Sequence, residues 1–289
     1  MSFEITTAFV QQYRTNVQHL LQQRGSRLRT AVSSATYTGK AAKAVEQVGA
    51  VAAQKRASRH ADTPLILTPH DARWVYPVDY EWADLVDNVD KLRMLVDPTS
   101  AYALNAAYAL GRAIDEEIIN AFFATSKTGE NGTTDTAFDT ANQQVAAGST
   151  GLTVAKLRSA KRVLMENDVD IDNDPLFIAI TAQQHDNMLG ETQAVSLDFN
   201  TRPTLVDGKI TSFMGFNFVH SEKLLKTGSD RRCPAWAMSG MHLGVWEDVT
   251  TRVTERADKS HAVQVFARGT FGATRLEEGK VVEVLCTEV

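Results

Sequence analysis

A long helical stretch between residues 97 and 127 most constrains what this chain can fold into. Asp97 supplies a capping carboxylate, and Pro98 suits the first turn of a helix. Apolar or small residues then recur at helical spacing: Ala107, Gly111, Ile114, Ile118 and Phe122, widened by Leu104, Tyr108 and Phe123. The pattern ends at Thr125, Ser126, Lys127 and Gly129. At about 1.5 Å per residue, we expect a rod of roughly 40 Å around which the other segments are arranged.

The size and composition of the chain place it among ordinary globular proteins. Its 289 residues suffice for one large or two medium domains with a sizeable core. No apolar run of about 18 residues suggests a membrane span, and the first residues lack the pattern of a secretion signal. The two cysteines, Cys233 and Cys286, are too few for a disulfide framework. We expect them to be buried free thiols in a reducing compartment.

The charge is unevenly distributed along the chain. The net charge is −5, yet residues 1–60 hold nine basic side chains and two acidic ones, so they carry +7 and the remainder −12. Such a basic front is suited to nucleic acid or to the acidic body of an identical neighbour. We favour the neighbour.

The first 62 residues contain two weaker helical patterns. Residues 3–24 predict an amphipathic helix that ends at Gly25. Its role is either terminal packing or docking on a neighbour. Residues 41–52 also fit helical spacing, although Gly39 and Gly49 weaken the pattern. The polar segment 54–62 that follows is expected to be exposed.

An aromatic alternation from Trp74 to Trp82 predicts a strand. Trp74, Tyr76, Tyr80 and Trp82 fall on one face, and Pro77 removes a ladder hydrogen bond, which favours an edge position. Such an apolar face needs a cover. Either the chain's own domain or another subunit supplies it.

The remaining pattern mixes helices and strands without βαβ regularity, which predicts an α+β fold. Asn131-Gly132 indicates a hairpin turn, and residues 134–151 are interpreted as a loop between domains. We expect helices over 152–165, capped by Thr153, and over 182–189. Strands are expected over 175–181, around 213–219, in two pieces around Gly240, and through most of 249–289, with charged turns at 257–260 and 277–280.

We find no constellation of catalytic, cofactor-binding or metal-binding residues in the sequence. The run from Asp168 to Asp174 resembles the start of a calcium loop, but the glycine and the glutamate that such a loop requires are missing. We interpret it as a solvated acidic turn. His60, Asp62 and His70 lack the spacing of a metal site, and neither cysteine lies at a predicted helix start that would activate it. A hydrolase is therefore disfavoured.

Several stretches resemble the major capsid proteins of tailed bacteriophages. They are 60–64 (HADTP), 90–93 (DKLR) leading into 97–100 (DPTS), 110–115 (LGRAID) with Ile118 and Ile119, 271–276 (FGATRL) and 281–284 (VVEV). Each motif is short, but together they follow the family order over nearly the whole chain. The resemblance implies the Hong Kong 97-type shell fold, which herpesvirus capsids and bacterial encapsulins share.

The resemblance also implies a domain plan. It assigns 1–32 to an N-terminal arm, 33–80 to an extended loop, 81–150 to a peripheral domain with the spine helix at 97–127, 151–249 to an axial domain, and 250–289 to strands that return to the peripheral domain. The family expects a strand where 41–52 has helical spacing. We follow the family at this point.

The function implied by the resemblance is a structural one. The chain would assemble into the pentamers and hexamers of an icosahedral head, without enzymatic activity, cofactor or metal, and the head would enclose double-stranded DNA without sequence-specific binding. Candidate contacts between subunits are Lys55, Arg56, Arg59, His60, Trp74, Tyr76 and Arg14. Because the chain lacks a long N-terminal extension, we expect a separate scaffolding protein. A portal and a decoration protein are further candidate partners, and no membrane is involved.

The implied location is the virion, after assembly in the host bacterial cytoplasm. Two alternatives remain open. One is an encapsulin-like or gene-transfer-particle shell protein of the same fold, and the other is a DNA-binding protein that uses the basic front.

Overall fold

The computed structural model describes residues 22–56, 58–59, 62–63, 65–86, 99–191, 205–206 and 209–288. The predicted cap at Asp97 and Pro98 and the candidate contacts Arg14 and His60 lie outside these residues. So does the predicted helix at 3–24, apart from residues 22–24, which are not helical. The described chain falls into two compact units. One comprises 22–26, 79–86, 99–113 and 247–269, and the other comprises most of the remainder.

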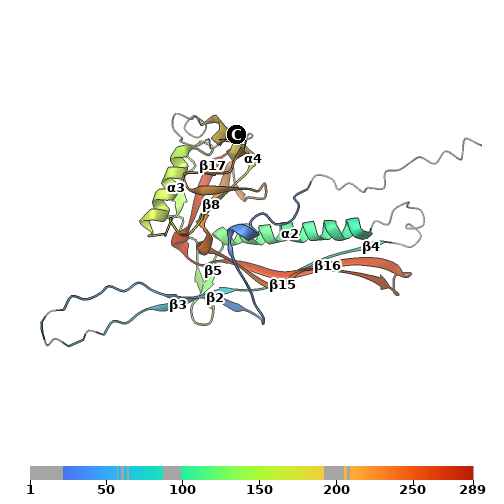
Figure 1. Ribbon diagram of the computed structural model, residues 1–289, viewed down its shortest axis with the longest axis horizontal. Helices are drawn as coiled ribbons and strands as arrows, with labels where there is room; N and C mark the ends of the chain where they lie inside the picture. The colour runs from blue at the N-terminus through green and yellow to red at the C-terminus, as the bar shows by residue number, and fades with distance from the viewer. Residues whose placement is uncertain are drawn as a thin grey trace, which may run out of the picture. The chain divides into compact units, whose positions relative to one another are not determined.

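The predicted long helix is present as α2, Thr99–Phe123 (Figure 1). It ends before Lys127, which the sequence pattern included in the helix, because the next residues form a hairpin. β5 (Ser126–Thr128) pairs with β6 (Thr134–Thr136), so Lys127 lies opposite Asp135 in a strand ladder. The hairpin turn predicted at Asn131-Gly132 is confirmed, and Gly132 takes the left-handed φ of 67° that favours glycine.

In the first unit, α2 lies beside long strands (Figure 1). Ala106 and Leu110 of the helix form a buried cluster with Ala267, and Tyr80, Trp82 and Val249 pack against it. Ala106 and Leu110, which face the strands, were not part of the predicted stripe, whereas its member Leu104 is 50% exposed. The predicted positions Ile114, Ile118 and Phe122 are buried further along the helix.

Gly111 lies where another segment of the chain passes close to α2. A Cβ atom at Gly111 would lie 2.6 Å from the Cα atom of Gly25 and 2.8 Å from the backbone nitrogen of Ser26. The segment that leads into the fold can pass against α2 only because Gly111 has no side chain. Arg112 holds the same segment by donating from Nη1 to Gln22 Oε1 at 2.8 Å.

The strands beside α2 belong to a four-stranded sheet with the order β1-β15-β16-β4. Their bounds are β1 Ser33–Thr36, β4 Val78–Val86, β15 Met241–Arg256 and β16 Ala262–Arg275. β1 runs parallel to β15. The β-rich end and its charged turn at 257–260 are confirmed, and β15 continues well past the short strand predicted after Gly240.

The second unit contains a seven-stranded sheet with the order β11-β12-β8-β14-β17-β7, to which β13 adds by pairing with β14. The bounds are β7 Gln144–Val145, β8 Leu176–Ile180, β11 Ser212–Phe213, β12 Phe216–His220, β13 Lys226–Thr227, β14 Asp230–Ala237 and β17 Val281–Thr287. The predicted strands at 175–181 and 213–219 are confirmed. The segment 134–151 is not wholly a loop, because it contributes β6 and β7.

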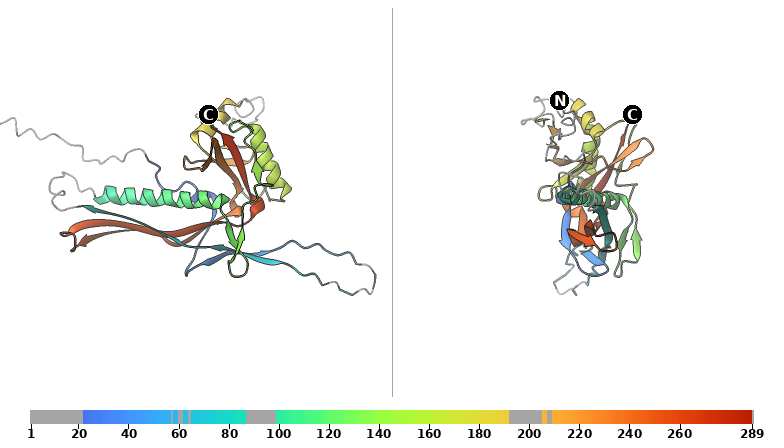
Figure 2. Two further views of the ribbon diagram at one scale, coloured as in Figure 1. Left: turned by 180° about the vertical axis from the view of Figure 1, so that it is seen from behind. Right: turned by 90° about the vertical axis from the view of Figure 1, so that its right-hand side faces the viewer.

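Two helices accompany this sheet. α3 (Val154–Glu166) begins at Thr153, whose hydroxyl accepts from the Lys156 backbone N–H as predicted, and α4 (Ala182–Gly190) follows β8. α3 lies against β17 and β7 (Figure 2). It buries Leu157 and Leu164 completely. Short 3₁₀ turns lie at Arg29–Ala31 (η2), Met238–Gly240 (η3) and Glu278–Lys280 (η4), and β9 (Leu205–Val206) pairs with β10 (Lys209–Ile210).

The core of the second unit gathers around Trp236, which is fully buried. Its ring centroid lies 4.6 Å from that of Phe122 and 5.8 Å from that of Phe177, and its Nε1 donates to the Ala31 carbonyl at 2.8 Å. Cys233 and Cys286 are buried free thiols in this sheet, as predicted.

The aromatic alternation from Trp74 to Trp82 is not a single strand. β3 (His70–Val75) and β4 belong to two different sheets, and the chain changes sheet at Tyr76 and Pro77. Pro77 has no N–H to donate to a ladder. The backbone of β16 also approaches closely, since a Cβ atom at Gly272 would lie 2.0 Å from the Tyr76 carbonyl oxygen. The predicted edge position is confirmed for β4.

Candidate functional site

The candidate site is an arm formed by β2 (Ala42–Val48), β3 and the segment 49–69 that joins them. β2 is a strand, so the preference for a strand over the helical spacing of 41–52 is confirmed. The two strands are antiparallel, and the Gly49 N–H donates to the Pro69 carbonyl at 2.8 Å at the mouth of the joining segment. Among the described residues of 50–68 there is no further helix or strand.

The joining segment exposes apolar side chains. Leu65 and Leu67 are 97% and 96% exposed, and Val48 is 62% exposed. Figure 1 shows the segment running out beyond β2 and β3, and no described helix or strand of its own unit lies beside it. A two-stranded excursion of this kind is marginal in water by itself. Leu65 and Leu67 therefore gain almost nothing from the core of their own chain.

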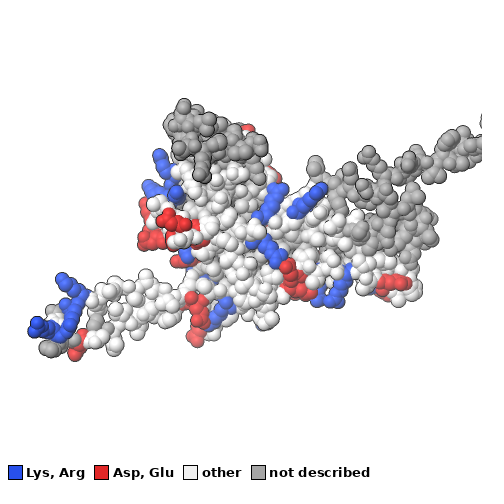
Figure 3. Space-filling view, in the orientation of Figure 1, with Lys and Arg blue, Asp and Glu red and all other residues white. Residues whose placement is uncertain are grey.

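Basic residues gather at the far end of the arm (Figure 3). Lys55, Arg56 and Arg59 are all exposed there, as predicted for the polar segment. Arg56 donates from Nε to the Ser58 carbonyl at 2.8 Å, so the turn itself holds this guanidinium. The tip thus carries positive charge next to apolar residues that the chain does not cover.

The base of the arm is fixed by an ion pair between a buried arginine and a partly buried glutamate. Arg73 in β3 is 5% exposed, and its guanidinium makes a bidentate contact with Glu278, with distances of 2.9 Å from Nη1 to Oε1 and 2.5 Å from Nη2 to Oε2. Gln47 in β2 accepts from Arg73 Nε at 3.3 Å and donates to the Leu276 carbonyl at 2.7 Å. Both strands of the arm are therefore tied to the segment around η4. Because the planar guanidinium makes two parallel hydrogen bonds to one carboxylate, it fixes the direction of the Arg73–Glu278 contact as well as its distance.

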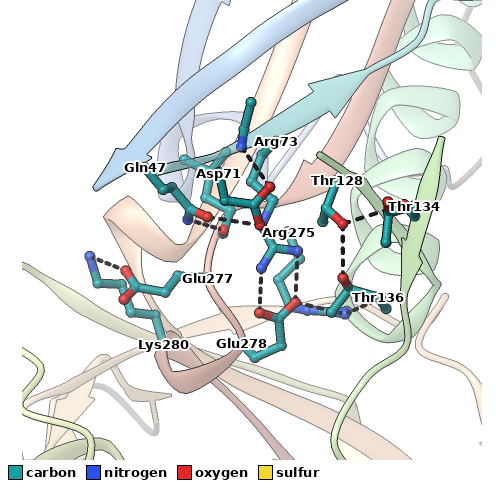
Figure 4. A network of polar contacts seen from close by, with 12 residues as sticks. Gln47, Asp71, Arg73, Thr128, Thr134, Thr136, Arg275, Glu277, Glu278 and Lys280 are labelled. Atoms are coloured by element: carbon teal, nitrogen blue, oxygen red, sulfur yellow. Dashed lines mark hydrogen bonds and ion pairs between the residues drawn. The ribbon is translucent and has the colours of Figure 1, made fainter. Parts of the chain in front are cut away.

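A second arginine, Arg275, belongs to the same network (Figure 4). Arg275 is fully buried and donates from Nη1 to the carbonyls of Phe122 and Ala124, at 2.7 and 3.0 Å. It satisfies carbonyls that the end of α2 leaves without helical partners. Its Nη2 lies 3.5 Å from Glu278 Oε1, so Glu278 is shared by both arginines. Burial lowers the pKa of Arg275 from its ordinary value.

Trp74 and Tyr76, predicted as contacts between subunits, make contacts within the chain. Trp74 donates from Nε1 to the Gly129 carbonyl at 2.8 Å, and Tyr76 donates to the Gly132 carbonyl at 3.3 Å. Their own chain covers part of the aromatic face, since Trp74 is half-buried while Tyr76 is 42% exposed. Their role between subunits stays a prediction.

The two charged residues that position this site, Arg73 (buried) and Glu278 (partly buried), were not predicted from the sequence. Arg73 and Glu278 carry no spacing signal, because the residues are far apart in the chain and meet only when β3 reaches η4. Nor was Asp115 predicted, a fully buried carboxylate on α2 that accepts from the backbone N–H groups of Arg27 and Leu28 at 3.0 to 3.1 Å. The available signal was weak, because Asp115 is the first of three consecutive acidic residues, Asp115-Glu116-Glu117.

The described residues contain no group of His, Cys, Asp or Glu side chains that could hold a metal ion. No helix in the described part of the chain is long and apolar enough to cross a membrane. The acidic stretch from Asp168 to Asp174 forms a turn, in which Asp170 accepts from Asn173 Nδ2 at 2.7 Å. That hydrogen bond lowers the pKa of Asp170 from its ordinary value.

Comparisons with known proteins agree with this architecture. No curated protein matches the sequence. Among solved structures, the capsid of cyanophage P-SCSP1u is similar, with a TM-score of 0.76 and 14% identity over 100% of this chain and 96% of that one. A protein from Mycobacterium phage Che8 is similar with a TM-score of 0.71 and 16% identity, over 96% of this chain and 97% of that one. The capsid of a native GTA particle is similar with a TM-score of 0.69 and 12% identity, over 99% of this chain and 98% of that one.

The sequence also matches a family model over almost its full length. The model describes a phage capsid protein, and the match covers residues 5–288. The solved structures share the fold across nearly all of both chains. The chain belongs to the phage capsid protein family and has the Hong Kong 97-type α+β fold.

Proposed function

We propose that this chain is the major capsid protein of a tailed phage head, assembling into pentamers and hexamers of an icosahedral shell around double-stranded DNA. The observation that carries the proposal is the family match over residues 5–288. In this proposal the role is structural and non-enzymatic. The protein resides in the virion after assembly in the host bacterial cytoplasm.

The arm supplies the physical reason for assembly. If extended, the segment 49–69 reaches roughly 30 Å beyond its base. Leu65 and Leu67 are almost fully exposed in the single chain. Burying one such side chain contributes roughly 1.5–3 kcal/mol, so a neighbouring copy that covers both stabilises a contact. Repeated contacts of this kind accumulate into a stable particle even where each is weak.

The charge distribution suits the same proposal. The positive tip at Lys55, Arg56 and Arg59 meets a neighbour whose remaining chain is acidic, and His60 and Arg14 are assigned to the same kind of contact. We retain the domain plan of 1–32, 33–80, 81–150, 151–249 and 250–289. A scaffolding protein, a portal and a decoration protein are proposed as partners.

A gene-transfer-particle shell is the second candidate, because the capsid of a GTA particle shares the fold at a TM-score of 0.69. The genes adjacent to this one distinguish the two, as does the DNA inside purified particles. A phage head contains one defined genome, whereas a transfer particle contains mixed host fragments. A DNA-binding role of the free protein predicts binding that weakens steeply with salt.

The proposal is tested by shortening the arm while keeping its base. Residues 50–68 are replaced by Asn-Gly, so that β2 and β3 remain joined where Gly49 already contacts Pro69. We expect circular dichroism to show a folded subunit and negative-stain microscopy to show no stable shells. The control replaces the exposed Ala52 and Ala53 by serine, which should leave assembly unchanged.

Intact shells from the shortened protein would contradict the role assigned to the arm. If the unaltered chain, expressed with and without its neighbouring genes, stays monomeric at every concentration, the proposed function itself is wrong.

A further inference from the structure

An apolar hollow with a basic rim lies on the exposed side of α3. It has a volume of about 350 Å³ and is lined by Arg158, Lys161, Arg162, Met165, Glu166 and Met214. Met165 is 53% exposed, although methionine usually packs inside a protein. Met214, in the turn between β11 and β12, lines the hollow from the other side. Flexible methionines are well suited to accept an apolar side chain.

The rim of this hollow offers positive charge. Arg158 is exposed on α3. The side chain of Arg162 is 71% exposed and lies 3.5 Å from Glu166, which is 63% exposed, so this pair is weak and screened by water. Lys161 donates from Nζ to the Met214 carbonyl at 3.0 Å, which fixes the turn beside the hollow. The site therefore accepts a ligand with an apolar centre and acidic flanks.

The acidic turn that follows α3 has this pattern. Asp170, Ile171 and Asp172 place a half-buried apolar side chain between two exposed carboxylates. Asp170 accepts from the backbone N–H groups of Asp172 and Asn173, each at 3.2 Å, so the turn is held in one shape. Asp174 fixes its far end by accepting from the Ser239 backbone N–H at 3.2 Å. A preformed turn loses little conformational entropy on binding.

We propose that the acidic turn at Asp170-Ile171-Asp172 of one copy docks into the α3 hollow of another copy, with Ile171 between Met165 and Met214 and its carboxylates on the basic rim. This inference rests on the proposed function and specifies one contact between its subunits. Each copy carries both halves of the contact. Because the two halves are different surfaces, the contact can repeat from one copy to the next.

The apolar lining of the hollow, together with its basic rim, favours a second copy over nucleic acid as the occupant. In Figure 3 acidic and basic side chains lie close together on the flank of the molecule that carries α3. Glu166 lines the hollow itself. A phosphate backbone has no apolar group to place between Met165 and Met214, whereas the acidic turn offers Ile171 to the methionines and carboxylates to Arg158 and Arg162.

The test reverses the charges singly and together. The variants are Arg158→Glu, Asp172→Lys and the double variant, each compared with the unaltered chain by sedimentation velocity over a range of concentrations. We expect each single reversal to raise the concentration needed for assembly about tenfold, and the double variant to recover to within about threefold. Circular dichroism checks that each variant is folded.

A matched control and an apolar variant complete the experiment. Asp186 on α4 is also an exposed carboxylate of the same unit, so Asp186→Lys makes the same charge change away from the hollow. We expect it to assemble normally, and Ile171→Ser to raise the required concentration as the single reversals do. Normal assembly of Arg158→Glu and Asp172→Lys overturns the inference but leaves the proposed function intact.

The inference is also overturned if the double variant assembles no better than the single ones, or if Asp186→Lys is equally impaired. Loss of packaged DNA with normal shells in Arg158→Glu would assign the hollow to nucleic acid instead. Failure of the unaltered chain to assemble contradicts the proposed function, and the two failures are therefore distinguishable.

Discussion

The seven-stranded sheet and the β2–β3 arm belong to one unit but obtain their stability in different ways. In the sheet, Trp236, Ile178 and Val284 are fully buried by the chain itself. In the arm, Leu65 and Leu67 are almost completely exposed, whereas the base is tied to the rest of its unit by the contact of Arg73 with Glu278 and by further hydrogen bonds. The sheet is complete within one molecule, whereas the arm is complete only where a second molecule covers it. A substitution should therefore affect folding in the first region and assembly in the second.

The largest effect is expected in the sheet. Trp236→Ala removes a fully buried ring that contacts Phe122 and Phe177. It also leaves the Ala31 carbonyl without the indole donor. We expect the free energy of unfolding to fall by about 3–5 kcal/mol. Urea denaturation of the unassembled subunit measures this loss, and a change below about 1 kcal/mol would show that the core does not depend on Trp236.

An intermediate effect is expected at the base of the arm. Arg73→Met keeps the apolar stem but removes the bidentate contact with Glu278, which we expect to destabilise the subunit by about 2 kcal/mol. Arg73→Lys is the matched control, because it keeps the charge without the planar fork and should lose less. Urea denaturation and electron microscopy together decide whether the base contributes to folding alone or also sets the direction of the arm. Unchanged stability in Arg73→Met would contradict the proposed role.

A smaller effect depends on pH and concerns the strand that leads into the arm. The two ring nitrogens of His242 form hydrogen bonds of 2.9 Å, one with Ser33 Oγ and one with Tyr37 Oη. Ser33 is the first residue of β1, and Tyr37 directly follows that strand. Burial lowers the pKa of His242 below its ordinary value of 6.5. The unfolded chain therefore takes up a proton as the pH falls through about 6.5, before the folded chain does.

Stability should be constant above that pH and decline below it, until the folded pKa is reached. Thermal unfolding of the unaltered chain and of His242→Gln, between pH 7.5 and pH 5, compares the two slopes. We expect a shallower slope in the variant. Equal slopes would mean that other groups cause the decline.

The smallest effect on folding is expected at the tip of the arm. Replacing Leu65 and Leu67 with serine removes side chains that contact water in the single chain, so the free energy of unfolding should change by less than about 0.5 kcal/mol. Assembly should nevertheless fail or require a much higher concentration. A large loss of stability in the monomer would show that the arm folds back onto its own chain, and the comparison between the two regions would no longer hold.

Much of the fold could be predicted from local patterns. The periodicity of α2, the Thr153 cap of α3, the buried strand β8 and the turn at Asn131-Gly132 each follow from residues that are close in the sequence. Where the prediction was wrong, a distant segment decided the outcome. The helix ends at Phe123, where the 126–136 hairpin follows and Arg275 donates to the carbonyls of Phe122 and Ala124. The aromatic run divides at Pro77 because β16 approaches Tyr76.

In the candidate site, too, the features that depend on nearby residues were predicted and those that depend on distant residues were not. The exposure of Lys55, Arg56 and Arg59 followed from composition, but the buried network of Arg73, Arg275 and Glu278 did not. These charged residues follow no periodic spacing in the sequence. Burying a charged side chain costs free energy unless a partner offsets it, and the partner of Arg73 is Glu278, 205 residues further along the chain.

The sequence by itself determined the helices α2, α3 and α4, most strands and the family, because each depends on spacing or on motifs in order along the chain, and the buried thiols followed from there being only two cysteines. The tertiary structure alone decided where the long helix stops, which sheet each aromatic residue joins, and how the arm is anchored. Those features depend on groups that are brought together by folding, so no local stretch of the chain contains the interaction that fixes them.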